Sequence, residues 1–188
     1  MRLIDKILFL RGVMLWCLFS LVGTFFAPSV EFLAGLLGTI LLIMSFDDNI
    51  NQKKPELVQL KSKLKIMVYM IIGIAIIDFT QNMIPIGVIP AIIELVEPAI
   101  GLYVLKLAIE MLRVGSGIPN NTIQIDKLNK IWLIGVVVMA EIGCTYLLSV
   151  FVRSFNLIAL TLLIAKMTFM LIKIVLFISF YKQLEIKK

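Results

Sequence analysis

Long runs of hydrophobic residues alternate along the chain with short polar or proline-containing segments. Each run is continuous, without the alternation of apolar and polar positions that marks the strands of a membrane β-barrel, so the pattern predicts helices. Most runs reach the length of about 20 residues that a helix needs to cross a bilayer. The predicted spans are residues 7–26, 30–46, 66–84, 89–112, 131–152 and 156–181.

Composition agrees with this pattern. Of the 188 residues, 61% are hydrophobic and 16% are charged, against about 45–50% and about 25% in average soluble domains. The excess excludes an ordinary soluble domain, and it also excludes disorder, which requires low hydrophobicity. We predict an all-α, polytopic membrane protein in which residues 1–188 form a single six-transmembrane-helix bundle.

The basic residues of the loops gather on one side of this topology. They occupy residues 1–6, 53–65, 113–130 and 182–188, while the opposite side carries Arg153. The positive-inside rule then places both termini in the cytoplasm and the protein in the plasma (inner) membrane. This asymmetry also explains the net charge of +6, so the lipid bilayer is the expected partner and nucleic acid is not.

One polar loop has a helical pattern of its own. Residues 56–65 place Leu57, Leu60 and Leu64 on one helical face, with Lys61 and Lys65 on another. Such an amphipathic segment is typical of a short helix in the membrane interface. We therefore predict an interfacial helix that leads into the third span.

A weak internal repeat suggests a subdivision of the bundle. The sequence VEFLAGL at residues 30–36 recurs as VEPAIGL at residues 96–102. Three tandem helical hairpins, residues 1–64, 65–127 and 128–188, would then be related by an axis along the membrane normal. The alternative is that the two segments resemble each other only because all apolar helices share a similar composition.

Acidic residues within the second predicted hairpin are the first candidates for a site. Asp78 lies late in the third span, and Glu94 and Glu97 lie early in the fourth, so all three fall in the outer half. A charge at the centre of a span costs about 2.5–3.5 kcal/mol on insertion scales and commonly marks a pathway or site. The functional interpretation is an outward-facing acidic cavity for a cation, a proton or a cationic solute. The alternative is that these carboxylates lie in the outer interface and bind nothing.

Two opposite charges lie near the middle of the last two spans. Glu141 and Lys166 fall at similar depth, which predicts an ion pair. The pair either takes part in substrate binding or a proton relay, or it fixes the register of the helices. Lys173, nearer the cytoplasmic end, is expected to extend to the interface. Lys106 and Glu110 are spaced as i,i+4 partners.

The sequence offers little enzyme chemistry. It contains no histidine, which excludes histidine metal sites and Ser-His-Asp triads, and its cysteines, Cys17 and Cys144, both lie in apolar stretches. No phosphate-binding loop or zinc-protease motif is present. We predict no catalytic residue, metal or cofactor.

In gross form, six spans with both ends inside are similar to the substrate-capturing subunits of energy-coupling-factor vitamin transporters. The Ala-x-x-x-Ala signature typical of their first span is absent from residues 7–26, so the chain is not assigned to that family.

Three classes of function follow. The first is a transporter, or the membrane subunit of a transporter, whose substrate-binding residues are Asp78, Glu94, Glu97, Glu141 and Lys166. The alternative is a non-catalytic membrane partner that assembles, regulates or protects another membrane protein. An intramembrane enzyme ranks last.

Overall fold

The computed structural model describes residues 4–19, 28–47, 54–81, 89–115, 122–149 and 155–185. These residues are helical, as predicted, apart from short flanking segments and one isolated β-bridge between Ile4 and Phe46. The elements are α1 (Lys6–Met14), the π-helix η1 (Leu15–Phe19), α3 (Pro28–Met44), α5 (Pro55–Gln81), α6 (Ile89–Gly115), α7 (Thr122–Ser149) and α8 (Phe155–Glu185).

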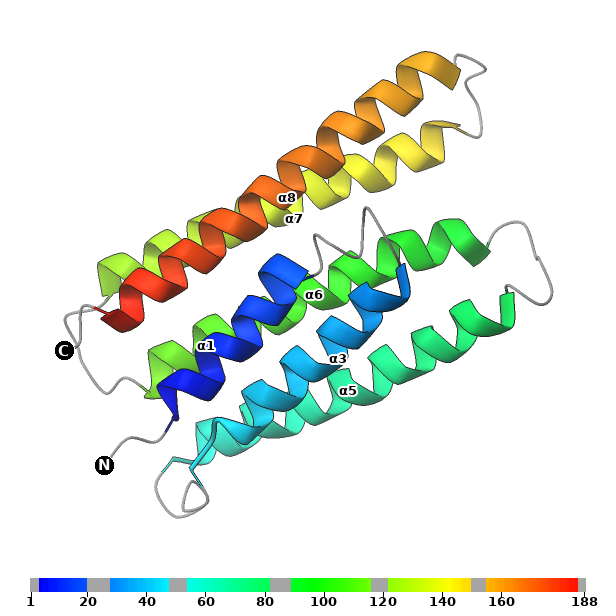
Figure 1. Ribbon diagram of the computed structural model, residues 1–188. Helices are drawn as coiled ribbons and strands as arrows, with labels where there is room; N and C mark the ends of the chain where they lie inside the picture. The colour runs from blue at the N-terminus through cyan, green and yellow to red at the C-terminus, as the bar shows by residue number, and fades with distance from the viewer. Residues whose placement is uncertain are drawn as a thin grey trace.

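The helices lie alongside one another and alternate in direction (Figure 1). Each helix packs against the next one along the chain, and α8 returns to contact α1 and η1. Phe9 of α1 and Phe180 of α8 make an edge-to-face ring contact with centroids 5.9 Å apart. This contact closes the bundle and places the beginning of α1 beside the end of α8.

The helix ends that the sequence assigns to the basic side gather at this same end of the bundle. The Asp5 carboxylate caps α1 by accepting from the Ile7 amide, and the Asp5 amide donates to the Ser45 carbonyl at 2.7 Å, next to the end of α3. The Lys54 ammonium, just before α5, donates to the Val114 carbonyl of α6 at 2.6 Å. Three of the predicted basic segments therefore meet here.

The centre of the bundle is built around Trp16 of η1. Its indole Nε1 donates to the hydroxyl of Thr39 at 3.0 Å, and both side chains are buried. Glycines from α3 and α6 face the indole ring. A Cβ atom at Gly101 would lie 2.8 Å from Trp16 Cζ3, and one at Gly35 would lie 3.0 Å from Trp16 Cη2. The absence of side chains at these positions is what admits the large ring.

The prediction of an interfacial helix at residues 56–65 is wrong. These residues form the first turns of α5, which continues without a break to Gln81. Leu57 and Leu64 lie on one helical face, as the spacing indicated, but both are fully buried in the protein core. The apolar face packs against the neighbouring helices, so it is covered by protein and not by lipid.

The helix of the fifth predicted span, α7, begins earlier than residue 131. It begins at Thr122, and its first turns bury Ile125 and Leu128 while Asp126 and Lys127 are exposed. The polar residues that suggested a loop are the outer face of an amphipathic extension of α7. A polar face and a buried face within one segment are typical of a helix at the surface of a bundle.

Among the residues that the structure describes, two helices are long and apolar enough to cross a membrane. They are Ile125–Tyr146 in α7, with a mean hydropathy of 1.5, and Ile158–Leu184 in α8, with 2.2. In their most apolar stretches, 28% and 33% of the residues are buried within the protein. The division into three hairpin units stays a prediction.

Candidate functional site

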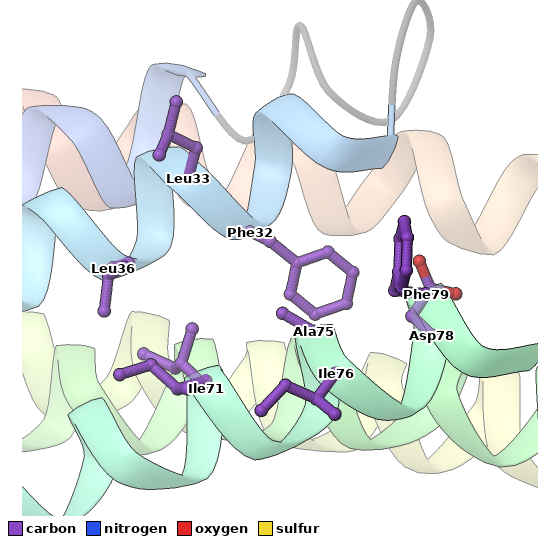
Figure 2. Close-up of a pocket in the computed structure, with 9 residues that line it drawn as sticks. Phe32, Leu33, Leu36, Ile71, Ala75, Ile76, Asp78 and Phe79 are labelled. Carbon is purple, nitrogen blue, oxygen red and sulfur yellow. The ribbon is translucent and has the colours of Figure 1, made fainter.

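A groove lies between α3 and α5 (Figure 2), with a volume of about 530 Å³. Among the described residues, most of its wall is aliphatic, and two phenyl rings and one carboxylate complete it. The described residues that line it are Phe32, Leu33, Leu36, Ile71, Ile72, Ala75, Ile76, Asp78 and Phe79.

Helical spacing brings these side chains together. On α5, Ile71, Ala75 and Asp78 are separated by four and three residues, so they share a face. On α3, Phe32 and Leu36 are likewise i,i+4 neighbours. Because α3 and α5 pack against each other in opposite directions, these two faces form the two walls of the groove.

The groove opens on the outer surface of the bundle. Its inner wall includes Ile71 and Phe32, which are both buried. Its rim is apolar and open, since the side chains of Phe79, Ile76 and Leu33 are 64%, 59% and 57% exposed. A molecule in this groove would contact the protein on one side and the surroundings of the bundle on the other.

The chemical character of the groove changes at the end where Asp78 lies. Asp78 is partly buried and is the one ionisable group among the described lining residues. Figure 2 shows its carboxylate beside the ring of Phe79, with the ring of Phe32 pointing from α3 towards the same end. This end of the groove therefore carries an acidic group, whereas the rest of its described lining is apolar.

The other acids of the predicted cavity lie on the neighbouring helix. Glu94 and Glu97 fall in the first turns of α6, which packs against α5. Their side chains lie outside the described part of the structure. The joint acidic cavity of Asp78, Glu94 and Glu97 therefore stays a prediction.

Glu141 and Lys166 lie on α7 and α8, which pack together. The Glu141 side chain is exposed, while its carbonyl accepts a hydrogen bond from the Thr145 hydroxyl at 2.8 Å. The Lys166 ammonium, which is partly buried, lies 5.8 Å from the centroid of the Tyr146 ring. Tyr146 is thus a partner of Lys166 that the sequence did not indicate, and the ion pair with Glu141 stays a prediction.

Lys173 does not extend to the interface, so that prediction is wrong. Lys173 is only 6% exposed, and its ammonium lies 5.0 Å from the centroid of the Phe169 ring. The physical reason is that α8 packs against α1 and η1, which enclose this part of the helix. A cation–π contact partly compensates for the loss of hydration.

The predicted pairing of Lys106 with Glu110 is confirmed, at 3.5 Å between Nζ and Oε1. Lys106 has two further partners on α7: it donates to Asn129 Oδ1 at 2.7 Å, and it lies 5.0 Å from the centroid of the Trp132 ring. Glu110 also binds Arg113, at 2.7 Å. The contacts of Lys106 with Asn129 and Trp132 hold α6 to α7, whereas the two ion pairs of Glu110 lie within α6. None of these residues is among the described residues that line the groove.

Sequence reasoning missed the aromatic residues of the groove. A signal was present, because the outer parts of two consecutive predicted spans each contain an acid followed by phenylalanine, Glu31-Phe32 and Asp78-Phe79. In antiparallel neighbours such dipeptides fall at similar depth. The side chain of Glu31 lies outside the described residues.

No protein family model, curated protein or solved structure matches this chain. The case for function therefore depends on its own residues. Within the described ranges, histidine, cysteine and acidic side chains nowhere form a group of three that could hold a metal ion.

Proposed function

We propose that this protein is a six-span bundle of the plasma membrane that binds a small cationic or polar solute, as a transporter or as the membrane subunit of one. Its outer surface supports insertion in lipid. Large apolar side chains are exposed on several helices, among them Tyr69 on α5, Val137 on α7 and Leu171 on α8. Soluble monomers rarely expose extensive apolar surface.

The hydroxyl groups on this surface also support insertion. Thr168 and Ser179 on α8 donate to the carbonyl groups of Ile164 and Val175, one turn earlier in the helix, at 2.9 and 2.7 Å. In hydrocarbon no water is available to satisfy polar groups, so a lipid-facing helix must satisfy them internally. These residues do so within their own helix.

The orientation that we propose follows from charge. The ends of the helices that carry the basic segments lie at one end of the bundle, around Asp5, Ser45 and Lys54. The positive-inside rule places this end, with both termini, in the cytoplasm. The groove with Asp78 then lies towards the outside.

The observation that carries the binding function is the position of Asp78 in the groove between α3 and α5. Ionisable residues within membrane-spanning segments commonly mark a pathway or site, and a carboxylate among apolar side chains would attract a cation that enters the groove. Glu94 and Glu97, on the adjacent helix, would extend the acidic region, and Glu141 with Lys166 would lie deeper along the path.

The proposal is tested by ligand-induced stabilisation of the purified protein. A panel of primary, secondary and quaternary amines is screened for an increase in melting temperature, because a ligand that binds the folded state stabilises it by mass action. We expect at least one amine to stabilise the wild type and to lose about 90% of its effect with Asp78→Asn. Glu56→Gln removes an exposed acid from the first turn of the same helix and serves as the control. Equal stabilisation of wild type and Asp78→Asn by every active amine would contradict the site.

A second candidate function is assembly with another membrane protein, and Glu141 favours it. This acid is exposed on α7, within the apolar segment Ile125–Tyr146. A transmembrane helix of a partner with a basic residue at the same depth would compensate its charge. A partner that co-purifies with the wild type and with Asp126→Asn, but not with Glu141→Leu, would support this function. Asp126 is the matched control because it is an exposed acid near the beginning of the same helix.

A further inference from the structure

We infer that the solute of the groove is an amphiphilic cation, an alkyl- or arylammonium compound that enters sideways from the lipid. This inference rests on the proposed function, because it assigns a chemical class to the ligand of Asp78. It depends on three properties of the groove: where it opens, what surrounds the carboxylate, and what lines the remainder.

The opening determines the route of entry. Phe79, Ile76 and Leu33 form an exposed apolar rim on the outer surface of α3 and α5. In a bundle surrounded by lipid, this rim faces hydrocarbon. A fully hydrophilic cation would have to lose its hydration shell before reaching the groove, whereas an amphiphile already partitions into the bilayer. The position of the rim therefore selects an amphiphile.

The surroundings of the carboxylate determine the charged group. Asp78 supplies one negative charge, and the rings of Phe32 and Phe79 stand at the same end of the groove (Figure 2). A carboxylate attracts substituted ammonium groups, and the methyl or methylene groups of such a cation can pack against neighbouring aromatic rings.

The remaining wall determines the body of the ligand. Aliphatic side chains from both helices line it, including Leu36, Ile71 and Ile72. Its volume of about 530 Å³ is within the range of small-molecule pockets, about 300–1,000 Å³. A phospholipid fits less well, since its phosphate would lie near Asp78 and the described lining residues include no cation. We therefore assign the groove to an ammonium amphiphile without a phosphate.

The experiment compares cations that share a headgroup and differ in their tail. Radiolabelled tetramethylammonium, hexyltrimethylammonium and decyltrimethylammonium are bound to the full-length protein in an uncharged maltoside detergent. Asp78→Asn is measured in parallel, and its signal is subtracted to remove partitioning into the micelle. Each buried methylene contributes about fourfold in affinity. We expect the Asp78-dependent affinity to rise at least about tenfold from the methyl to the decyl compound.

Two variants test the groove without altering the carboxylate. Phe79→Leu removes one aromatic face and should weaken binding of the decyl compound by about threefold or more. Tyr69→Leu is the matched control, because Tyr69 is an exposed aromatic residue of α5 that does not line the groove. Ala75→Phe should block the groove and abolish binding. Monodispersity on size-exclusion chromatography verifies that each variant folds.

The outcomes separate the inference from the proposed function. Asp78-dependent binding that rises with tail length and falls with Phe79→Leu supports both. Asp78-dependent binding could instead be equal for all three cations, or insensitive to Phe79→Leu and Ala75→Phe. Either result would contradict the assignment of an amphiphilic ligand, while the cation site at Asp78 would still be supported. The absence of Asp78-dependent binding for all three compounds and for the amine panel would overturn both.

Discussion

The indole of Trp16 donates its N–H to the hydroxyl of Thr39, and that hydroxyl in turn donates to the carbonyl of Gly35 at 2.8 Å. The chain of bonds joins η1 to α3 at the centre of the bundle. Every polar atom along it is buried, so each bond satisfies a group that would otherwise be costly to enclose. The position of α3, and hence one wall of the groove, depends on this connection.

Replacement of Thr39 by valine is expected to lower the free energy of unfolding by about 1–2 kcal/mol, because the buried hydrogen bond that Trp16 donates to Thr39 is lost. Titration with SDS, followed by circular dichroism, measures the change. Thr168→Val is the control. Thr168 also donates to a carbonyl one turn earlier, but it is exposed and accepts no bond from an indole in the described contacts. Equal effects of the two substitutions would show that the indole bond contributes nothing.

The contact between α1 and α3 at Gly12 gives a second prediction. A Cβ atom there would lie 2.8 Å from the Gly38 carbonyl oxygen and 2.9 Å from Leu42 Cγ. The first of these is a backbone atom, so the helices themselves must separate. We expect Gly12→Ala to cost about 1–3 kcal/mol of stability.

Gly73→Ala is the control for that substitution. A Cβ atom at Gly73 would meet nothing within 4 Å, so we expect this change to be neutral or to stabilise α5 by up to about 1 kcal/mol through helix propensity. Both variants are measured by the same SDS titration. A loss of stability with Gly73→Ala as large as that with Gly12→Ala would contradict the packing described here.

The two cysteines should differ in reactivity. Cys17 is fully buried beside α8, whereas Cys144 is exposed on α7. We expect a lipid-soluble maleimide to modify Cys144 in the folded protein and Cys17 only after denaturation, because access limits the reaction at a buried thiol. Mass spectrometry of tryptic peptides measures both sites. Early modification of Cys17 would show that the core around Trp16 is open.

The helical fold was predictable because continuous apolar runs leave few alternatives. Errors arose where polar residues lie on a helix. Lys61 and Lys65 suggested a separate interfacial segment, but they are the outer face of α5, whose inner face buries Leu57 and Leu64. Hydropathy records whether a residue is polar, and it does not record whether the opposite face is covered by protein or by lipid.

The candidate site was predictable in part. Asp78 stood out as a charge within an apolar run, and the structure places it in a groove. The groove itself could not be predicted, because it depends on how α3 and α5 pack, and packing brings Phe32 within reach of Asp78 from a distant part of the sequence. The prediction that Lys173 extends to the interface was wrong for the same reason, since the burial of this side chain depends on α1 and η1.

The orientation of α5 gives the last prediction. Ser62 and Thr80 are both exposed, near opposite ends of this helix, and a rise of about 1.5 Å per residue separates them by about 27 Å. That distance is close to the thickness of the hydrocarbon core, about 30 Å, so the two positions should lie on opposite sides of the membrane. We introduce Ser62→Cys or Thr80→Cys into a chain that carries Cys17→Ala and Cys144→Ala. In intact bacterial cells, a membrane-impermeant maleimide should label the Thr80→Cys protein alone, and lysis should make the Ser62→Cys protein reactive. The reverse pattern would invert the topology and place the groove towards the cytoplasm, while labelling of both proteins in intact cells would show that α5 does not cross the membrane.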